Sequence, residues 1–231
     1  MYRVRVHDLK FVSCRTWVGL DAETGVPLVI KPVELHRSQE VIRVLHDNRI
    51  TGIPHVMGLT MTAVGPSVAY RWISGDSLTD KKRDEKEASQ LIASMLLLLE
   101  RVSMVAQREF VHGDLKLQHF IRTGSGQLAL TDLTTSYFYP HHQVEKKKKI
   151  QGTSAYLAPE IKKGELSATA DLYSLALIWL SMLAGKPVYC LNLQQIQTVL
   201  GSVDTLQQQC LQNWLNNDPQ KRDKELFWKR K

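Results

Sequence analysis

Two aspartates in loops are the residues of this sequence best suited to chemistry. Asp114 lies in the segment Val111–His119, directly after a long apolar stretch, and Asp132 follows eighteen residues later at the end of an apolar run. Carboxylates on loops that flank strands can converge on one cleft, where one orients an attacking hydroxyl and the other holds a metal ion. Lys116 could neutralise charge on a phosphoryl group in transit. Either aspartate alone would usually be a turn or cap residue, but the joint pattern is much harder to explain in that way.

Strand-like residues come first in the chain and helical patterns follow. Residues 2–31 are rich in β-forming side chains, whereas 37–46 has apolar residues at helical spacing. Longer helical patterns then appear over 88–105, 171–184 and 203–216. Segregated strands and helices predict an α+β protein. We expect one domain over residues 1–231, with a small β-rich N-lobe at about 1–73 and a mainly helical C-lobe at about 76–231.

The chain carries a formal net charge of +7 over 231 residues. A basic protein favours polyanionic partners, which include nucleotides, nucleic acid and acidic lipid. The excess charge is concentrated in Lys146–Lys149 and in the tail Lys224–Lys231. These two segments read as a solvated loop and a solvated terminus, or as contacts for an acidic partner. Nothing beyond charge supports binding to nucleic acid, which is therefore not the expected partner.

Cysteine usage and apolar segments bear on where the protein works. Cys14, Cys190 and Cys210 are far apart and show no metal-ligand spacing, so we expect reduced thiols rather than disulfides or a zinc site. The longest apolar stretches, Leu91–Leu99 and Leu172–Gly185, are shorter than the roughly 18 residues that span a bilayer. The N-terminus lacks the apolar core of a secretory signal. We therefore expect a cytoplasmic protein without a membrane span, delivered into a host cell if it is a bacterial effector.

Five motifs, in order along the chain, resemble those of the protein kinase superfamily between about residues 10 and 222. HGDLK resembles the HRDLK catalytic loop, and TDL stands in the place of DFG. GTSAYLAPE is very close to GTxxYxAPE, DLYSL resembles the start of the buried central helix, and DPQKR resembles the DPxxR near the C-terminus. These motifs occupy His112–Lys116, Thr131–Leu133, Gly152–Glu160, Asp171–Leu175 and Asp218–Arg222. The resemblance implies the bilobal fold of that family.

The resemblance also implies a role for each matching residue. Asp114 would be the catalytic base that positions the substrate hydroxyl, and Lys116 would contact the γ-phosphate of ATP. Lys31 matches the VAIK lysine and would contact the α- and β-phosphates, while Asp132 would bind Mg²⁺. The other matching positions are the gatekeeper Tyr70, the adenine-binding hinge Arg71, Trp72 and Ile73, and the structural residues His112, Thr153, Glu160, Asp171 and Arg222. Within that structural set, Glu160 would pair with Arg222.

Lys31 also needs an acidic partner from the helix that follows it. We expect Glu40 to be this partner, because it opens the stretch of helical periodicity, and Glu34 is the second choice. The pair would belong to the nucleotide-binding part of the site.

Three family features are changed in this chain. Leu9, Phe11 and Cys14 stand near the positions of three phosphate-binding glycines, so the Gly-rich loop is missing and the phosphate grip should be weaker or reshaped. His119 stands where the family has a metal-binding asparagine. Imidazole suits softer ions than Mg²⁺, so a single Mg²⁺ or tolerance of Mn²⁺ is expected. Gly113 replaces the arginine that docks a phosphorylated loop, so loop phosphorylation is not expected as the main switch.

Three functions are compatible with these residues. The first is a Ser/Thr protein kinase that uses ATP and Mg²⁺, because Lys116 and Thr153 accompany that specificity in the family. The second is a pseudokinase that serves as a binding or scaffold module, which the absent glycines and His119 favour. The third is a kinase-fold enzyme that phosphorylates a small molecule or glycolipid, which His119 supports and Gly152–Glu160 opposes. The first fits best, because all four residues assigned to chemistry are retained.

Overall fold

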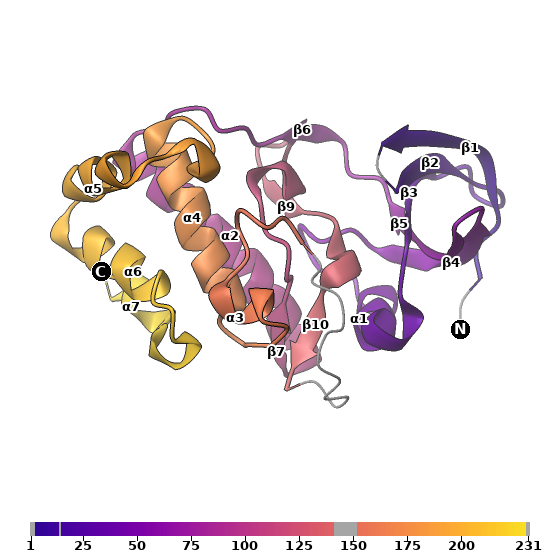
Figure 1. The fold of residues 1–231 in the computed structure, drawn as a ribbon. Coiled ribbons are helices and arrows are strands. Elements are labelled where there is room, and N and C mark those ends of the chain that lie inside the picture. Colours follow the sequence, from indigo (N-terminus) through magenta and orange to yellow (C-terminus); the bar gives the residue numbers. More distant parts are fainter. Residues whose placement is uncertain (1–2, 14, 141–151, 230–231) are drawn as a thin grey trace.

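The computed structural model describes residues 3–13, 15–140 and 152–229 (Figure 1). The lysine run Lys146–Lys149, Cys14 and the last two residues of the basic tail lie outside the described residues. Helices gather at one end of the molecule, and a five-stranded sheet forms the other end. The predicted α+β fold, with a β-rich N-terminal part and a mainly helical C-terminal part, is therefore confirmed.

The N-terminal sheet is antiparallel, with the strand order β1-β2-β3-β5-β4. In β3, Leu28 and Ile30 are fully buried on one face, and Lys31 lies on the other face because successive side chains of a strand alternate. The following helix, α1, crosses from β3 to β4 and packs against β4 and β10. The bounds are β1 Val6–Ser13, β2 Thr16–Asp21, β3 Pro27–Pro32, α1 Leu35–Asp47, β4 Val56–Thr62 and β5 Gly65–Arg71.

Short strands and 3₁₀ turns hold the loops between the sheet and the helices. One three-stranded sheet has the order β6-β8-β9, and β7 pairs separately with β10. Strands form at Phe120 and over Leu128–Leu130, and β10 forms in a segment whose sequence shows little periodicity. The bounds are β6 Gly75–Ser77, β7 Glu109–Val111, β8 Phe120–Thr123, β9 Leu128–Leu130 and β10 Tyr137–Tyr139, with 3₁₀ turns at Leu117–His119 and Leu133–Thr135.

The C-terminal part is built around α4, which is buried on almost every side. Trp179 of α4 and Trp214 of α6 are fully buried and form an aromatic cluster with Phe227, with ring centroids 5.6–6.2 Å apart. The sequence did not indicate α5, whose start is fixed by a capping box between Asn192 and Gln195. The helices are α2 Glu85–Ala106, α3 Pro159–Lys162, α4 Ala170–Ala184, α5 Leu193–Gly201, α6 Thr205–Trp214 and α7 Glu225–Trp228.

The longest helix, α2, leads directly to the catalytic-loop strand β7. It begins where the Asp84 side chain accepts a hydrogen bond from the N–H of Glu87, and it ends at Gln107 in the left-handed conformation. By length and composition, α2 is apolar enough to cross a membrane, which the shorter run Leu91–Leu99 did not indicate. Its buried face packs against α4, β7 and β9. This packing accounts for the apolar residues of the buried face, whereas Leu97, Met104 and Val105 are exposed.

Candidate active site

A buried carboxylate at the start of α4 fixes the loop that carries Asp114. Asp171 accepts hydrogen bonds from the backbone N–H of His112 at 2.6 Å and of Gly113 at 3.0 Å. Burial raises the pKa of Asp171, although His112 and the two N–H groups act in the opposite direction. The structural role predicted for Asp171 is therefore visible as a direct clamp on the loop backbone.

His112 connects the two loops that hold the aspartates. Its buried ring lies between them, with Nε2 3.0 Å from the carbonyl oxygen of Thr131 and Nδ1 3.3 Å from the backbone nitrogen of Asp114. These contacts assign the ring proton to Nε2, because the carbonyl can only accept and the N–H of Asp114 can only donate. The loops around Asp114 and Asp132 are thus joined through one imidazole.

The carboxylate of Asp114 is bound by the segment that follows the second loop. Its Oδ1 accepts a hydrogen bond of 2.6 Å from the backbone N–H of Thr153. Gly152 makes this approach possible: it has φ of +112°, and a Cβ there would lie 3.3 Å from Asp114 Oδ1 and 3.1 Å from the carbonyl oxygen of Gly113. The sequence predicted a role for Thr153 but not that its backbone would supply the contact.

An ion pair deeper in the C-terminal part anchors the same segment. Arg222 donates from Nη1 and Nη2 to the two oxygens of Glu160 at 2.6 and 2.8 Å, and both side chains are buried. Arg222 also lies over the ring of Tyr173, with Cζ 5.0 Å from the centroid. The predicted pairing of Glu160 with Arg222 is confirmed.

Asp132 lies at the meeting point of three side chains. Its carboxylate accepts a hydrogen bond of 2.6 Å from Lys31 and one of 3.1 Å from the Thr134 hydroxyl, and it lies 3.4 Å from His119 Nε2. Burial favours a higher pKa, but the charge of Lys31 and the hydrogen bond that it donates act against burial, so the pKa of Asp132 lies below its usual value. Asp132 adopts a left-handed conformation with φ of 62°, which is uncommon outside glycine and recurs at functional sites.

The imidazole of His119 presents a free lone pair to Asp132. Its Nδ1 lies 2.8 Å from the carbonyl oxygen of Asp114, which can only accept, so Nδ1 carries the proton. Burial lowers the pKa of His119 to about 4, with a further contribution from His112, and the ring is therefore neutral near pH 7. Two acceptors, His119 Nε2 and Asp132 Oδ2, then face each other, and this nitrogen–oxygen donor pair fits a divalent cation.

A metal ion bound at this pair would need further ligands. Among the described residues, no group of three His, Cys, Asp or Glu side chains is placed to hold a metal ion. Lys116 lies near enough to His119 for its charge to contribute to the lowered pKa of that ring. Phosphate oxygens and water would therefore complete the coordination, as is usual for Mg²⁺ in nucleotide sites.

The predicted pairing of Lys31 with Glu40 is wrong. Lys31 reaches Asp132, whereas Glu40 accepts a hydrogen bond of 2.9 Å from Arg108. Helix α1 packs against β10, so this carboxylate meets the guanidinium that precedes β7. The second choice, Glu34, is the residue before α1, in an extended conformation.

The predicted hinge lies at the end of β5 and directly after it. Tyr70 is buried, and burial, followed by the charge of Asp132, raises the pKa of its phenol. The backbone N–H groups of Arg71 and Trp72 donate to the carbonyls of His55 and Pro27, each at 2.9 Å. Within this predicted hinge, the backbone N–H of Ile73 bonds to no described residue.

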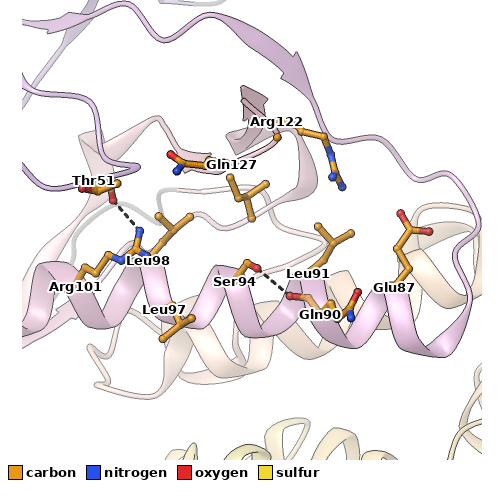
Figure 2. A pocket seen from close by; sticks show the side chains of 12 residues that line it. Thr51, Glu87, Gln90, Leu91, Ser94, Leu97, Leu98, Arg101, Arg122 and Gln127 are labelled. Carbon is orange, nitrogen blue, oxygen red and sulfur yellow. Dashed lines mark hydrogen bonds between the residues drawn. The ribbon is translucent and has the colours of Figure 1, made fainter. Parts of the chain in front are cut away.

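A hollow of about 420 Å³ lies along α2, and neither Asp114 nor Asp132 lines it (Figure 2). Figure 2 shows Arg101 at its rim, where the side chain donates to the Thr51 carbonyl at 3.1 Å. Its lining is Thr51, Glu87, Gln90, Leu91, Ser94, Leu97, Leu98, Arg101, Arg122, Gly126, Gln127 and Leu128. None of the predicted site residues is among them.

Two residues that shape the site escaped the sequence analysis. Arg108 binds Glu40, and the buried Ser38 of α1 donates its hydroxyl proton to the carbonyl of Thr134 at 3.2 Å. Both contacts join segments far apart in the chain, and neither residue belongs to a recognisable motif. No local signal could have revealed them.

Comparison with known proteins gives one family and several relatives. Residues 32–226 match the family described as "Protein kinase domain". U-box domain-containing protein 33 of Arabidopsis thaliana is 28% identical over 68% of this chain and 19% of its own length. Serine/threonine-protein kinase PAK 5 of Rattus norvegicus is 23% identical over 74% of this chain and 25% of its own. The phosphorylase b kinase gamma catalytic chain, liver/testis isoform, of Bos taurus is 34% identical over 49% and 29%. The match thus spans less than a third of each relative.

Proposed function

Because this chain belongs to the protein kinase domain family, we propose that it transfers the γ-phosphoryl group of ATP to serine or threonine hydroxyls of a protein substrate. The observation that carries the proposal is the meeting of Lys31, Asp132 and His119 beside the loop of Asp114. A cation-binding carboxylate, a phosphate-binding lysine and a carboxylate for the hydroxyl are the parts that phosphoryl transfer requires.

The side chains have distinct tasks in this reaction. Asp114 orients the attacking hydroxyl and accepts its proton, and the N–H of Thr153 keeps the carboxylate in position. Lys116 neutralises charge that develops on the phosphoryl oxygens. Lys31 would bind phosphate oxygens, and Asp132 and His119 would hold the cation. ATP and a divalent metal ion, when bound, supply the phosphoryl group and further charge neutralisation.

The Ser/Thr preference rests on Lys116 and Thr153, as the sequence resemblance implies. Relatives named as serine/threonine-protein kinases support the same substrate class. The identity of the substrate protein, and any acidic partner of the basic segments, lies beyond this proposal.

A binding role without catalysis is the second candidate, and two contacts favour it. Oδ1 of Asp114 accepts a hydrogen bond from the N–H of Thr153, and Oδ2 of Asp132 accepts one from Lys31. A chain that only presents a docking surface could keep both of these contacts permanently. ATP and metal would have to displace Lys31 from Asp132 for transfer to occur.

The site assignment is tested by replacing one cleft carboxylate and one carboxylate elsewhere. Asp132→Ala should abolish transfer and weaken binding of metal-ATP, because the cation loses its charged oxygen ligand. Asp47→Ala, at the exposed end of α1, is the matched control and should behave as wild type. ATP binding by thermal shift and transfer of labelled phosphate measure both effects. Unchanged transfer by Asp132→Ala would contradict the assignment.

The choice of metal follows from the His119 lone pair. A nitrogen–oxygen donor pair favours Mn²⁺ or Co²⁺ over Mg²⁺, because imidazole affinity rises along the divalent series whereas Mg²⁺ prefers oxygen ligands. His119→Asn should therefore shift the preference of both metal binding and transfer towards Mg²⁺, and His7→Asn, on β1, is the control. A wild type that binds Mg²⁺ and Mn²⁺ with the same ratio as His119→Asn would contradict the role of the imidazole.

A further inference from the structure

The guanidinium of Arg108 joins three segments that are far apart in the chain. Nη1 donates to Glu40 of α1 at 2.9 Å, and Nη2 donates to the carbonyl of Pro140 at 2.6 Å and, more weakly, to that of Phe138 at 3.5 Å. The Cζ atom also lies 5.4 Å from the centroid of the Phe138 ring. A planar cation with several donors suits such multiple contacts. Arg108 itself directly precedes β7, the strand that leads into the catalytic loop.

The Arg108 side chain binds the chain directly beyond the last paired residues of β7 and β10. Phe138 pairs with Phe110 and Tyr139 pairs with Glu109, so Pro140 and Arg108 are next in register. Proline has no N–H and cannot extend the ladder. The Arg108 side chain binds the Pro140 carbonyl in place of a backbone hydrogen bond. The segment that begins at Asp132 is therefore bound to β7 and Arg108 as far as Pro140.

The segment after Asp132 crowds position 113 of the catalytic loop. Gly113 has φ of +79°, and a Cβ there would lie 3.2 Å from the carbonyl oxygen of Thr135. The hydroxyls of Thr135 and Ser136 donate to the carbonyl of His112 at 2.9 and 3.3 Å. The segment after Asp132 therefore packs directly on the loop backbone, and Gly113 permits this close approach.

Helix α1 is bound to the same segment at a second point. Ser38 is buried, and its hydroxyl donates to the Thr134 carbonyl, two residues after Asp132. This bond joins α1 to the turn that precedes β10. The Glu40–Arg108–Pro140 contacts join α1 to the same segment again, directly after β10. All of these contacts use groups that the chain itself supplies.

We propose that Arg108 is a positioning residue that tethers α1 and residues 138–140 to the catalytic-loop strand, so that the site is assembled without a phosphoryl group on the segment after Asp132. This inference rests on the proposed phosphoryl transfer, and it identifies how that site is held in its working geometry. Glu40 belongs to this tether. The sequence has glycine instead of arginine at position 113, after β7. Arg108, directly before β7, supplies a guanidinium in its place.

The test compares Arg108→Gln and Arg108→Ala with Arg101→Gln. Arg101 is a suitable control, because it also donates to a backbone carbonyl and lies on α2, beside a hollow that none of the predicted site residues lines. Amide hydrogen exchange of β10 reports the tether without requiring catalysis. Steady-state kinetics of wild type and the variants report the effect of the tether on phosphoryl transfer. The kinetics of wild type before and after phosphatase treatment report whether transfer depends on phosphorylation. Added guanidinium ion tests whether the missing side-chain group alone explains the loss of kcat in Arg108→Ala.

The tether predicts faster exchange in β10 for Arg108→Gln and Arg108→Ala, and normal exchange for Arg101→Gln. It predicts a kcat about a hundredfold lower for both Arg108 variants, as displaced catalytic groups can cause, with little change in KM for ATP. Guanidinium at millimolar concentration should restore much of the kcat of Arg108→Ala, and phosphatase should leave the wild-type rate unchanged.

Wild-type exchange in β10 of Arg108→Gln, or a lost kcat that guanidinium does not restore, would overturn the positioning role. A wild-type rate that falls after phosphatase treatment would overturn assembly without phosphorylation. If wild type transfers no phosphate at all, the proposed function fails, and hydrogen exchange alone then decides whether the tether exists.

Discussion

Removing Glu160 should destabilise the protein strongly, because it would leave a buried guanidinium without its counter-charge. Arg222 is 0% exposed and Glu160 4% exposed in their side chains, and two hydrogen bonds of 2.6 and 2.8 Å join them. Breaking a buried ion pair on one side typically costs about 3–5 kcal/mol. For a chain of this length each kcal/mol lowers Tm by about 2–4 °C. Glu160→Ala should therefore melt roughly 6–20 °C below wild type.

Thermal and urea unfolding of matched variants measure this loss. Glu109→Ala is the control, because Glu109 forms an exposed ion pair with Lys224 at 3.4 Å and such pairs contribute about 0–1 kcal/mol. The double variant Glu160→Met, Arg222→Met should recover part of the loss, since no charge then remains buried. Recovery should be incomplete, because Arg222 also donates to the carbonyls of Asn216 and Thr169. Equal Tm changes for Glu160→Ala and Glu109→Ala would refute the reasoning.

Two further predictions concern the cleft. Gly152→Ala should lower the transfer rate and Tm, because its Cβ would lie 2.7 Å from Leu157 and crowd Asp114, whereas Gly201→Ala has open space and should change neither. His119 has a folded pKa of about 4, below its ordinary value of 6.5. Between these pH values the unfolded chain binds more protons, so the unfolding free energy should fall as pH is lowered. His119→Asn should show a shallower fall in urea titrations, and identical pH dependence would contradict the neutral, buried imidazole.

The parts of the site that the sequence predicted are those encoded by local spacing. The loop around Asp114 and the position of Asp132 each lie in a short motif in which neighbouring residues fix the backbone. The pairing of Glu160 with Arg222, 62 residues apart, was instead implied by the resemblance of two separate motifs to those of the family. Fold class was predictable for a similar reason, since strand-like alternation and helical spacing occupy different parts of the chain.

The wrong prediction for Glu40 shows where such reasoning stops. Helical periodicity placed Glu40 on a helix after Lys31 correctly, but it could not reveal which of two distant cations the carboxylate would meet. Arg108 lies 68 residues away in sequence, and only the packing of α1 against β10 brings it close. Similarly, the contact of Asp114 with Thr153 uses a backbone N–H, which leaves no trace in residue type.

Transfer of labelled γ-phosphate from ATP tests the central claim most directly. Wild type and Asp114→Ala would each be incubated with Mg²⁺ or Mn²⁺ and a cell lysate, and protein, lipid and small-molecule fractions would be counted. The account predicts label on protein, recovered as phosphoserine or phosphothreonine, with wild type and its loss with Asp114→Ala. Label confined to the lipid or small-molecule fraction, or no label with wild type under any condition, would contradict it.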